Sequence, residues 1–362
     1  MKNFYVSGLR EGMKLTTLFL VKKKDSKTTK SNKPFLVLWL GDRTGDIKAI
    51  VWDDAEEAGR SFSANDFIEA IDAKVDSYQG ELQLSIKRVR KVEPDQVDIS
   101  DFQPALPTEV VDALFAELED ICRSLSDRDL RRLLGLFFED QAFVAGLKRA
   151  PAAKAMHHVY LGGLLEHTLS VVKIARGIAD HYTCVDRDML IAGAFLHDMG
   201  KIKELEYSSG FDYTDEGNLV GHLLLGLRML DEKIAMLPDF PAATAVHLRH
   251  IIASHHGVAE FGSPKEPRTP EAAALHLIDN IDAKVWEFVS LIDSEIDQPG
   301  SFTSFHRALG LSLFKGDGER RPQPTYGFRM EKPQEGRPAP WTEPAAEAPA
   351  GASLDLFGKP KK

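Results

Sequence analysis

The sequence has very little cysteine. Among 362 residues only Cys122 and Cys184 are cysteines, and neither belongs to a Cys-x-x-Cys motif. Two cysteines cannot form a disulfide framework, and they argue against zinc-thiolate sites. The chain also lacks an N-terminal signal pattern and any apolar run long enough to cross a bilayer. These absences predict a cytoplasmic protein with no membrane contact.

An excess of basic residues is also missing, since the formal net charge is −10. Indiscriminate coating of nucleic acid depends on many Lys and Arg side chains and is therefore disfavoured, although a local basic groove is not. Histidine is unevenly distributed, because all 12 histidines lie after residue 156. Scattered surface histidines would not show this asymmetry, which points to a metal-binding half of the chain.

Residues 1–92 have the pattern of a small β-barrel. Short runs rich in β-branched and aromatic residues alternate with turns, and a helix-like stretch over 54–60 separates the third run from the fourth. The expected strands are residues 16–24, 35–40, 47–52, 67–75 and 82–89. Five strands with a helix after the third resemble the OB-fold, a Greek-key barrel that binds oligonucleotides on one face.

One strand of this barrel leaves two readings open. Phe35, Val37 and Trp39 share one face, Leu36, Leu38 and Leu40 share the other, and one set must fill the barrel. If the leucines do so, Phe35 and Trp39 point outward as a platform for base stacking, with Lys22, Lys23 and Lys24 available for phosphates. The alternative is that Trp39 belongs to the core and the lysines are simply solvated.

The remainder of the chain divides by composition. Residues 93–107 are a proline-bearing linker, residues 108–150 a helical lead-in, and residues 151–314 a helical domain with apolar residues at three- and four-residue spacing. From residue 315 to 362 Gly, Pro, Glu, Arg and Ala dominate, which is typical of a disordered tail. We therefore predict a multidomain α and β protein, with the barrel first and an all-α domain second.

Metal-ligand residue types recur in the helical domain, each on its own helix-sized segment. Their order is His, His-Asp, His, His-His, Asp, and they are His167, His197, Asp198, His222, His255, His256 and Asp279. This ordered set resembles the HD-domain metal-dependent phosphohydrolases. The resemblance implies that His167, His197, Asp198 and Asp279 hold one divalent ion and that Asp198, His222 and His255 hold a second. His256 is either a further ligand or supports one.

Mixed nitrogen and oxygen ligands suit Mn²⁺, Fe²⁺, Co²⁺ or Zn²⁺ better than Mg²⁺ alone, although Mg²⁺ stays possible. Two ions about 3.5–4 Å apart activate a hydroxide for in-line attack on phosphorus. Asp198 is the natural bridge, and Lys201, one helical turn beyond it, is the candidate to hold the scissile phosphate. Glu166 and Asp282 are candidates to orient ligand histidines. His157 and His158 either reach the phosphate or cap a helix.

An OB-like domain before an HD domain resembles the YhaM-type 3′→5′ exoribonucleases. The stretches His157 to His167 and Asp279 to Lys284 are similar to that family's entry into and exit from the HD helices. The resemblance implies that the barrel captures single-stranded RNA, or possibly DNA, and that water releases nucleoside 5′-monophosphates from the 3′ end. It also implies a homo-oligomer.

Three alternatives stay open. The first is an HD phosphohydrolase of a small or cyclic nucleotide with a regulatory OB domain. The second is a di-iron oxygenase on the same ligands, and the third is a non-catalytic nucleic-acid-binding adaptor. The apolar end of the tail, Leu354-Asp-Leu-Phe357, resembles the peptide that bacterial replication proteins insert into the sliding clamp, without its usual glutamine. It is a possible contact for a protein partner.

Overall fold

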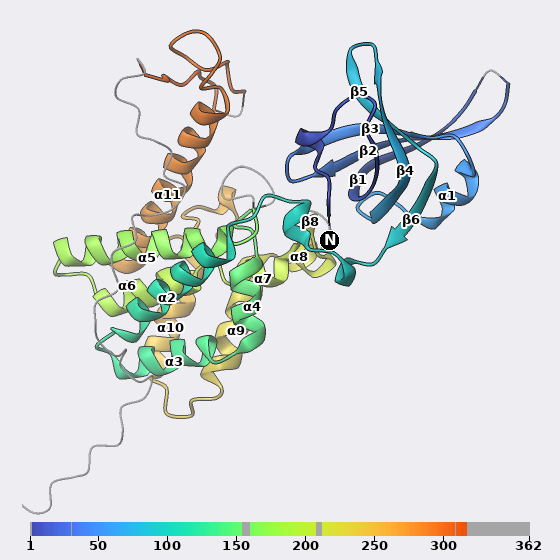
Figure 1. Cartoon of the computed structure of the whole chain (residues 1–362). Coiled ribbons are helices and arrows are strands. Elements are labelled where there is room, and N and C mark those ends of the chain that lie inside the picture. Colours follow the sequence, from blue (N-terminus) through green and yellow to red (C-terminus); the bar gives the residue numbers. More distant parts are fainter. Residues whose placement is uncertain (1, 30, 154–159, 208–211, 308, 317–362) are drawn as a thin grey trace, which may run out of the picture.

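The computed structural model describes residues 2–29, 31–153, 160–207, 212–307 and 309–316. Figure 1 shows a β-barrel beside a helical body, with the chain passing once from the first to the second. His157, His158 and the Leu354–Phe357 segment lie outside the described residues. No helix among the described residues combines the length and apolar character needed to span a membrane.

The barrel is closed by pairing of its first and fourth strands. The sheet order is β1-β2-β3-β5-β4-β6, and β1 also pairs with β4. Its elements are β1 (Lys14–Thr28), β2 (Pro34–Asp42), β3 (Gly45–Val51), α1 (Ala55–Ser61), β4 (Phe67–Tyr78), β5 (Glu81–Ile86) and β6 (Arg88–Val92). The β1–β4 pairing closes the sheet into a barrel as in the OB-fold, and β6 pairs with β4 alone among the described strands. The predicted OB-like barrel is confirmed.

The expected fifth strand over 82–89 is wrong as a single element. The chain bends at Lys87, so β5 pairs with the C-terminal half of β4 while β6 pairs with its N-terminal half. Both halves lie along the same edge of β4, because the other edge is taken by β1. Alternation of apolar residues does not reveal such a break, since the run reads as one strand in sequence.

The barrel interior is filled from alternate positions. Leu36, Leu38 and Leu40 of β2 are buried, and they pack with Phe19, Ile68 and Leu84. The first of the two open readings of β2 is therefore the one that the structure adopts. Phe35 and Trp39 are partly exposed on the outer face.

The segment between the domains is packed on both of them. Phe102 is buried with Leu20 and Phe67 at the base of the barrel, and the backbone of Arg43 donates to the carbonyl of Asp101. On the other side, Leu106 and Leu161 are joined by a backbone hydrogen bond. Two short 3-10 turns, Pro94–Gln96 and Ile99–Asp101, lie in it. The predicted linker therefore makes packing and hydrogen-bond contacts with both domains.

The helical body begins with three helices that are capped as their sequences require. These are α2 (Thr108–Arg123), α3 (Arg128–Phe138) and α4 (Gln141–Arg149). Asp127 and Asp140 accept hydrogen bonds from the first free backbone N–H groups of α3 and α4. Leu118, Leu134 and Phe137 then join one core with the helices that follow.

The helices of the HD domain surround that core. They are α5 (Gly163–His181), α6 (Arg187–Leu196), α7 (Lys201–Glu204), α8 (Asp215–Val220), α9 (His222–Ile234), α10 (Ala242–Ser254) and α11 (Pro270–Ser294). Besides α8, the segment between α7 and α9 holds a small two-stranded ladder, β7 (Leu205–Glu206) with β8 (Asp212–Tyr213). The all-α domain is confirmed in its main helices. Two turns of 3-10 helix, Val6–Gly8 and Ala259–Phe261, complete the elements.

Order continues past the end of α11. Residues 301–315 fold back on themselves through backbone hydrogen bonds between Thr303 and Leu313 and between Ser301 and Lys315. Lys315 is buried and its ammonium donates to the carbonyls of Glu295 and Gln298. The predicted start of the tail at residue 315 is therefore too early by at least this residue.

Candidate metal centre and nucleic-acid face

The His197-Asp198 pair lies where a buried helix ends. Every residue of α6 from Asp188 to Leu196 is buried, and His197 forms the C-cap. The ring Nδ1 of His197 donates to the carbonyl of Ala194 at 2.8 Å, which turns Nε2 towards the interior of the domain. His197 is fully buried and Asp198 is 2% exposed. Both side chains are therefore withdrawn from water and must be matched by partners within the protein.

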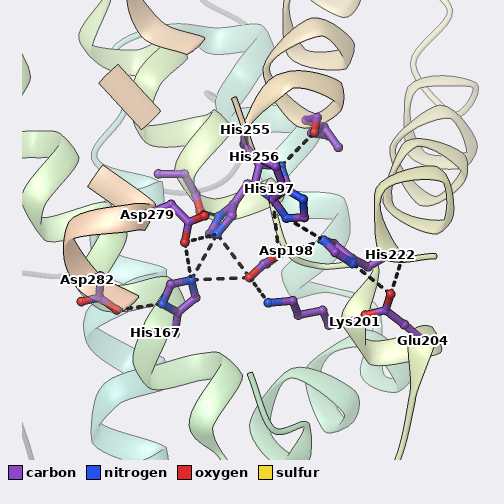
Figure 2. A network of polar contacts seen from close by, with 12 residues as sticks. His167, His197, Asp198, Lys201, Glu204, His222, His255, His256, Asp279 and Asp282 are labelled. Carbon is purple, nitrogen blue, oxygen red and sulfur yellow. Dashed lines mark hydrogen bonds and ion pairs between the residues drawn. The ribbon is translucent and has the colours of Figure 1, made fainter. Parts of the chain in front are cut away.

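A first group of ligand atoms collects around Nε2 of His167. This atom lies 3.2 Å from Oδ1 of Asp279, 3.3 Å from Nε2 of His197 and 3.5 Å from Oδ2 of Asp198. The chosen ligand atoms of His167, His197 and Asp279 all lie within 4.8 Å of one another (Figure 2). Three helices, α5, α6 and α11, thus contribute to one point.

A second group collects on the other side of Asp198. Its Oδ1 lies 3.5 Å from Nε2 of His222 and 3.6 Å from Nε2 of His255. His222 and His256 approach to 3.2 Å between their Nε2 atoms. Asp198, His222, His255 and His256 form a second set within 4.8 Å. The two oxygens of one carboxylate therefore face two different histidine groups.

The donor set fits divalent cations. Oδ1 of Asp198 and Nε2 of His255 are buried and have no hydrogen-bond partner among the described residues. Buried polar atoms without partners are rare, and both atoms are oriented as ligands with a free lone pair. In both groups, imidazole nitrogens also face one another, an arrangement that a shared cation between them explains better than a hydrogen bond.

Asp282 orients the first histidine. It accepts a hydrogen bond from Nδ1 of His167 at 2.8 Å, and the hydroxyl of Ser170 donates to its other oxygen. A carboxylate behind a ligand histidine fixes the tautomer and the ring direction. Glu166 lies elsewhere, since it accepts the hydroxyl hydrogen bond of Tyr160. Of the two candidates for orienting ligand histidines, Asp282 contacts His167 in this structure, and the role of Glu166 stays a prediction.

Glu204 is a site residue that sequence reasoning missed. Its Oε1 accepts from both the backbone N–H of His222, at 2.9 Å, and the ring Nδ1, at 3.0 Å. It therefore holds His222 as Asp282 holds His167. Burial alone would raise the pKa of Glu204, but the hydrogen bonds from His222 outweigh it and lower that pKa. The available signal was its position one turn after Lys201 on a short helix.

Tight backbone packing fixes the same region. A Cβ on Gly200 would collide with the carbonyl oxygen of His222, and one on Gly217 would collide with the carbonyl oxygen of Glu204. Gly200 allows the start of α7 to lie directly against α9, and Gly217 allows α8 to lie directly against the end of α7. The geometry of the second group therefore depends on close approach between backbones as well as on side chains.

The negative charge of Asp198 is offset by a lysine within the same site. The ammonium of Lys201 lies 2.6 Å from Oδ2 of Asp198. Burial by itself would raise the pKa of Asp198, but the charges of Lys201 and His197 hold it well below its ordinary value. Burial lowers the pKa of His255 to about 4. His255 is therefore neutral at physiological pH and ready to bind a metal without losing a proton.

The outer face of the barrel separates the two predicted aromatics. Phe35 stacks on Trp52 with 4.9 Å between ring centroids. Trp52 shares a surface hollow with three acidic residues and one basic residue, namely Asp54 at the N-cap of α1, Glu56 and Glu57 in its first turn, and Lys33. Such a setting is unfavourable for a phosphate backbone. Phe35 is thus the less suitable of the two aromatics for nucleic acid.

Trp39 lies in a different environment. In the strand register it stands between Lys23 of β1 and Lys48 of β3, and the Lys23 ammonium lies 5.0 Å from its ring centroid. Lys22 is exposed beside a β-bulge in β1. Lys24 differs, because its ammonium donates to the carbonyls of Gly59 and Phe62 at the end of α1. The structure thus assigns Lys24 to support of the barrel, contrary to the phosphate contact that we predicted for it.

Comparison with known proteins matches both halves of the chain. The profile of the HD domain matches residues 164–284, and that of an OB-fold nucleic acid binding domain matches residues 20–92. The chain is 35% identical to the 3′-5′ exoribonuclease YhaM of Bacillus velezensis over 298 residues, 81% of this chain and 91% of that protein. The chain belongs to the YhaM family. The YhaM of Shouchella clausii is 35% identical over 320 residues, 86% of this chain and 97% of that protein.

Membership in the YhaM family confirms the resemblance seen in the sequence. The YhaM of Bacillus subtilis is 34% identical over 81% of this chain. An HD domain and a family of named exoribonucleases make this protein an enzyme of the hydrolase class that binds divalent metal. The OB-fold domain makes it a nucleic-acid-binding protein.

Proposed function

We propose that this protein is a 3′→5′ exoribonuclease that hydrolyses single-stranded RNA to nucleoside 5′-monophosphates with two divalent ions. The observation that carries the proposal is the position of Asp198. Its two oxygens lie 3.4–3.6 Å from histidine nitrogens of two separate ligand groups. A shared carboxylate between two histidine groups is the arrangement that two-ion phosphodiester hydrolysis requires. The relatives named exoribonuclease add the direction and the substrate.

Ligand roles follow from the two groups. His167, His197, Asp198 and Asp279 would hold one ion, and Asp198, His222, His255 and His256 would hold the other. Mn²⁺, Fe²⁺, Co²⁺ and Zn²⁺ suit these ligands. When bound, the ions supply a nucleophilic water at neutral pH and positive charge at the phosphoryl oxygens.

The protein's own residues position the substrate and the protons. Lys201 is placed to neutralise a non-bridging phosphate oxygen, because its ammonium already lies beside Asp198 and is only 13% exposed. Desolvation strengthens that interaction in the closed site. Asp282 and Glu204 keep the ring Nδ1 protons of His167 and His222, so that both Nε2 atoms stay available as ligands.

The outer face of the barrel is the proposed capture site for the single strand. Lys23, Trp39, Lys48 and Gln83 follow one another across four strands in register. A base stacks on Trp39 while the flanking lysines contact phosphates. Asp25, 3.3 Å from Lys23, is readily exchanged for a phosphate, because a surface ion pair contributes at most about 1 kcal/mol.

The test uses 5′-labelled single-stranded RNA and the matching DNA, each with Mn²⁺, Mg²⁺ or EDTA. A metal-dependent ladder of shortening labelled products supports a 3′→5′ exonuclease, and the comparison of RNA with DNA sets the substrate. Asp198→Ala removes the ladder, whereas Asp215→Ala, an exposed aspartate of α8, leaves it intact. Absence of a ladder with retained cleavage of a small phosphodiester would favour the small-nucleotide phosphohydrolase. Binding without any turnover would favour the adaptor.

Two wider expectations belong to the same proposal. The scarcity of cysteine keeps the cytoplasm as the proposed compartment. We also propose that the protein is a homo-oligomer. The proposed division of the chain is 1–92, 93–107, 108–150 and an HD domain that runs from 151 to at least Lys315, with the tail after it.

A further inference from the structure

The C-terminal part of the described chain carries an unusual amount of exposed apolar surface. Among the residues that the structure describes, nine of the twenty exposed large hydrophobic side chains lie between 277 and 314. Five are on α11 and four on the folded-back segment after it. We call this the α11 surface, and its members are Leu277, Ile281, Val285, Phe288, Val289, Phe302, Phe305, Leu311 and Phe314.

The helical members form a stripe with a regular period. Leu277, Ile281, Val285 and Phe288 follow one another at spacings of four, four and three. This is the spacing by which one helix packs along another. The one charged pair beside the stripe, Lys284 with Glu287 at 2.8 Å, is internally neutralised. The stripe therefore presents a surface suited to a second helix.

The protein's own core does not use this stripe. The buried residues of α11 are Glu271, Ala272, Leu275, Ile278 and Glu287, so its apolar core contacts end near the middle of the helix. Figure 1 shows the later turns of α11 rising out of the helical body. The following segment adds further exposed apolar side chains, since Phe302 and Phe314 pair with 5.3 Å between their centroids and remain about 60% exposed. Hydrogen bonds from Ser304 and Lys315 to Glu295 tie this segment to the end of α11.

We propose that the α11 surface is the face through which two copies of this chain associate. The exposed parts of the nine side chains present on the order of 900 Å², close to the about 800 Å² that each partner contributes to a standard interface. Monomeric proteins rarely expose a contiguous apolar area of that size. The apolar end of the chain's own tail offers Leu354, Leu356 and Phe357, too few to cover nine side chains.

The proposed association reaches the metal centre through one helix. Asp279 and Asp282, which serve the first ligand group, lie on α11 between Leu277 and Val285. A second copy packed along the stripe would therefore support, from outside, the turns of α11 that carry Asp279 and Asp282. This inference rests on the proposed homo-oligomer and names its surface. It does not depend on the choice of substrate.

The test measures the molar mass of the full-length protein by light scattering and sedimentation over a wide concentration range. Val285→Glu places a charge in the stripe and should weaken self-association by about tenfold or more. Val246→Glu in α10 is the matched control, because Val246 is 62% exposed and Val285 is 59% exposed. The control should keep the mass of the wild type. Circular dichroism verifies that both variants fold.

A second variant, Phe305→Ser, tests the folded-back segment independently and covers the case in which Val285→Glu fails to fold. A truncated chain that ends at residue 316 tests the alternative occupant. If the truncated chain forms a particle with the same number of subunits as the full-length protein, the second copy is supported as the occupant of the α11 surface. A monomeric full-length chain that associates only after truncation would overturn the proposal in favour of the tail.

Two further outcomes overturn different statements. A wild-type monomer at all concentrations, before and after truncation, removes both the homo-oligomer and its surface. An oligomer that Val285→Glu and Phe305→Ser leave unchanged removes the α11 surface alone. Neither result bears on nuclease activity, which is measured separately.

Discussion

The ammonium of Lys201 lies 2.6 Å from Oδ2 of Asp198, three residues earlier in the chain. This pair joins the carboxylate shared by the two ligand groups to the one lysine of the His197-to-Lys201 motif. On the function proposed above, Asp198 is a metal ligand, and the lysine beside it would be available to a phosphate oxygen of the substrate.

Replacing Lys201 should therefore impair turnover more than metal binding. We expect Lys201→Met to lower kcat by about 10²-fold, the usual effect of losing one group that stabilises transition-state charge. Bound metal, measured by elemental analysis, should stay at the wild-type stoichiometry. Lys203→Met is the control, because Lys203 is exposed on the same short helix. Loss of metal together with activity would show that Lys201 maintains the site instead.

Glu204 should control the second ligand group alone. Glu204→Ala removes the acceptor for both the backbone and the ring of His222. We expect the affinity for one of two ions to fall by about 10–100-fold while the other stays bound. Glu204→Gln keeps an acceptor oxygen and should recover part of the affinity. Equal loss of affinity for both ions in calorimetric titration with Mn²⁺ would argue against separate sites. Glu206→Ala, at an exposed glutamate two residues further along the chain, is the control.

The two outward aromatics of the barrel should differ in their contribution to RNA binding. Trp39→Ala is expected to weaken single-stranded RNA binding by about 1–3 kcal/mol, because stacking on the ring is lost. Trp52→Ala should have little effect, since that ring stacks on Phe35 near acidic residues. Fluorescence anisotropy with labelled RNA measures both. Equal losses of RNA affinity in the two variants would indicate that the RNA also contacts the surface around Phe35 and Trp52.

Stability should depend on pH in opposite directions with and without metal. Burial alone would lower the pKa of His167, but hydrogen bonds to Asp198, Asp279 and Asp282 outweigh it and raise that pKa well above 6.5. A raised folded-state pKa stabilises the metal-free protein fully below pH 6.5, and that contribution is lost as pH rises through the raised pKa.

Metal binding reverses this slope, because the ion must displace the His167 proton and its affinity therefore rises with pH. In EDTA, the contribution of His167 to Tm should fall above pH 6.5, and with saturating Mn²⁺ Tm should rise over the same range. Thermal unfolding at several pH values measures both slopes. Parallel slopes in EDTA and in Mn²⁺ would show that His167 is not a ligand.

The sequence was most informative where chemistry is carried by residue type. The order of histidines and aspartates from His167 to Asp279 identified side chains that the fold brings within a few ångströms of one another. Hydrophobic periodicity predicted the first four strands of the barrel and the main helices, but it did not reveal the break between β5 and β6. Family membership then agreed with the resemblance.

The features that were missed depend on contacts that no local pattern encodes. Glu204 reads as an ordinary charged residue, and its role exists only because α7 packs against the start of α9. Lys22, Lys23 and Lys24 are adjacent in sequence, yet a bulge in β1 and the nearby end of α1 give each a different environment. The break at Lys87 depends on tertiary pairing, because β5 pairs with the C-terminal half of β4 and β6 pairs with its N-terminal half.

The ligand groups draw on widely separated parts of the chain. His167 and its carboxylate partner Asp282 are 115 residues apart, and the intervening ligand candidates lie just after α6 and α10, at the start of α9, and on α11 itself. Every ribosome that makes this protein holds the messenger RNA for it. A nascent chain displays its barrel early, but the first ligand group stays incomplete until Asp279 has left the exit tunnel. The order of synthesis therefore leaves the first ligand group among the last parts of the protein to be completed.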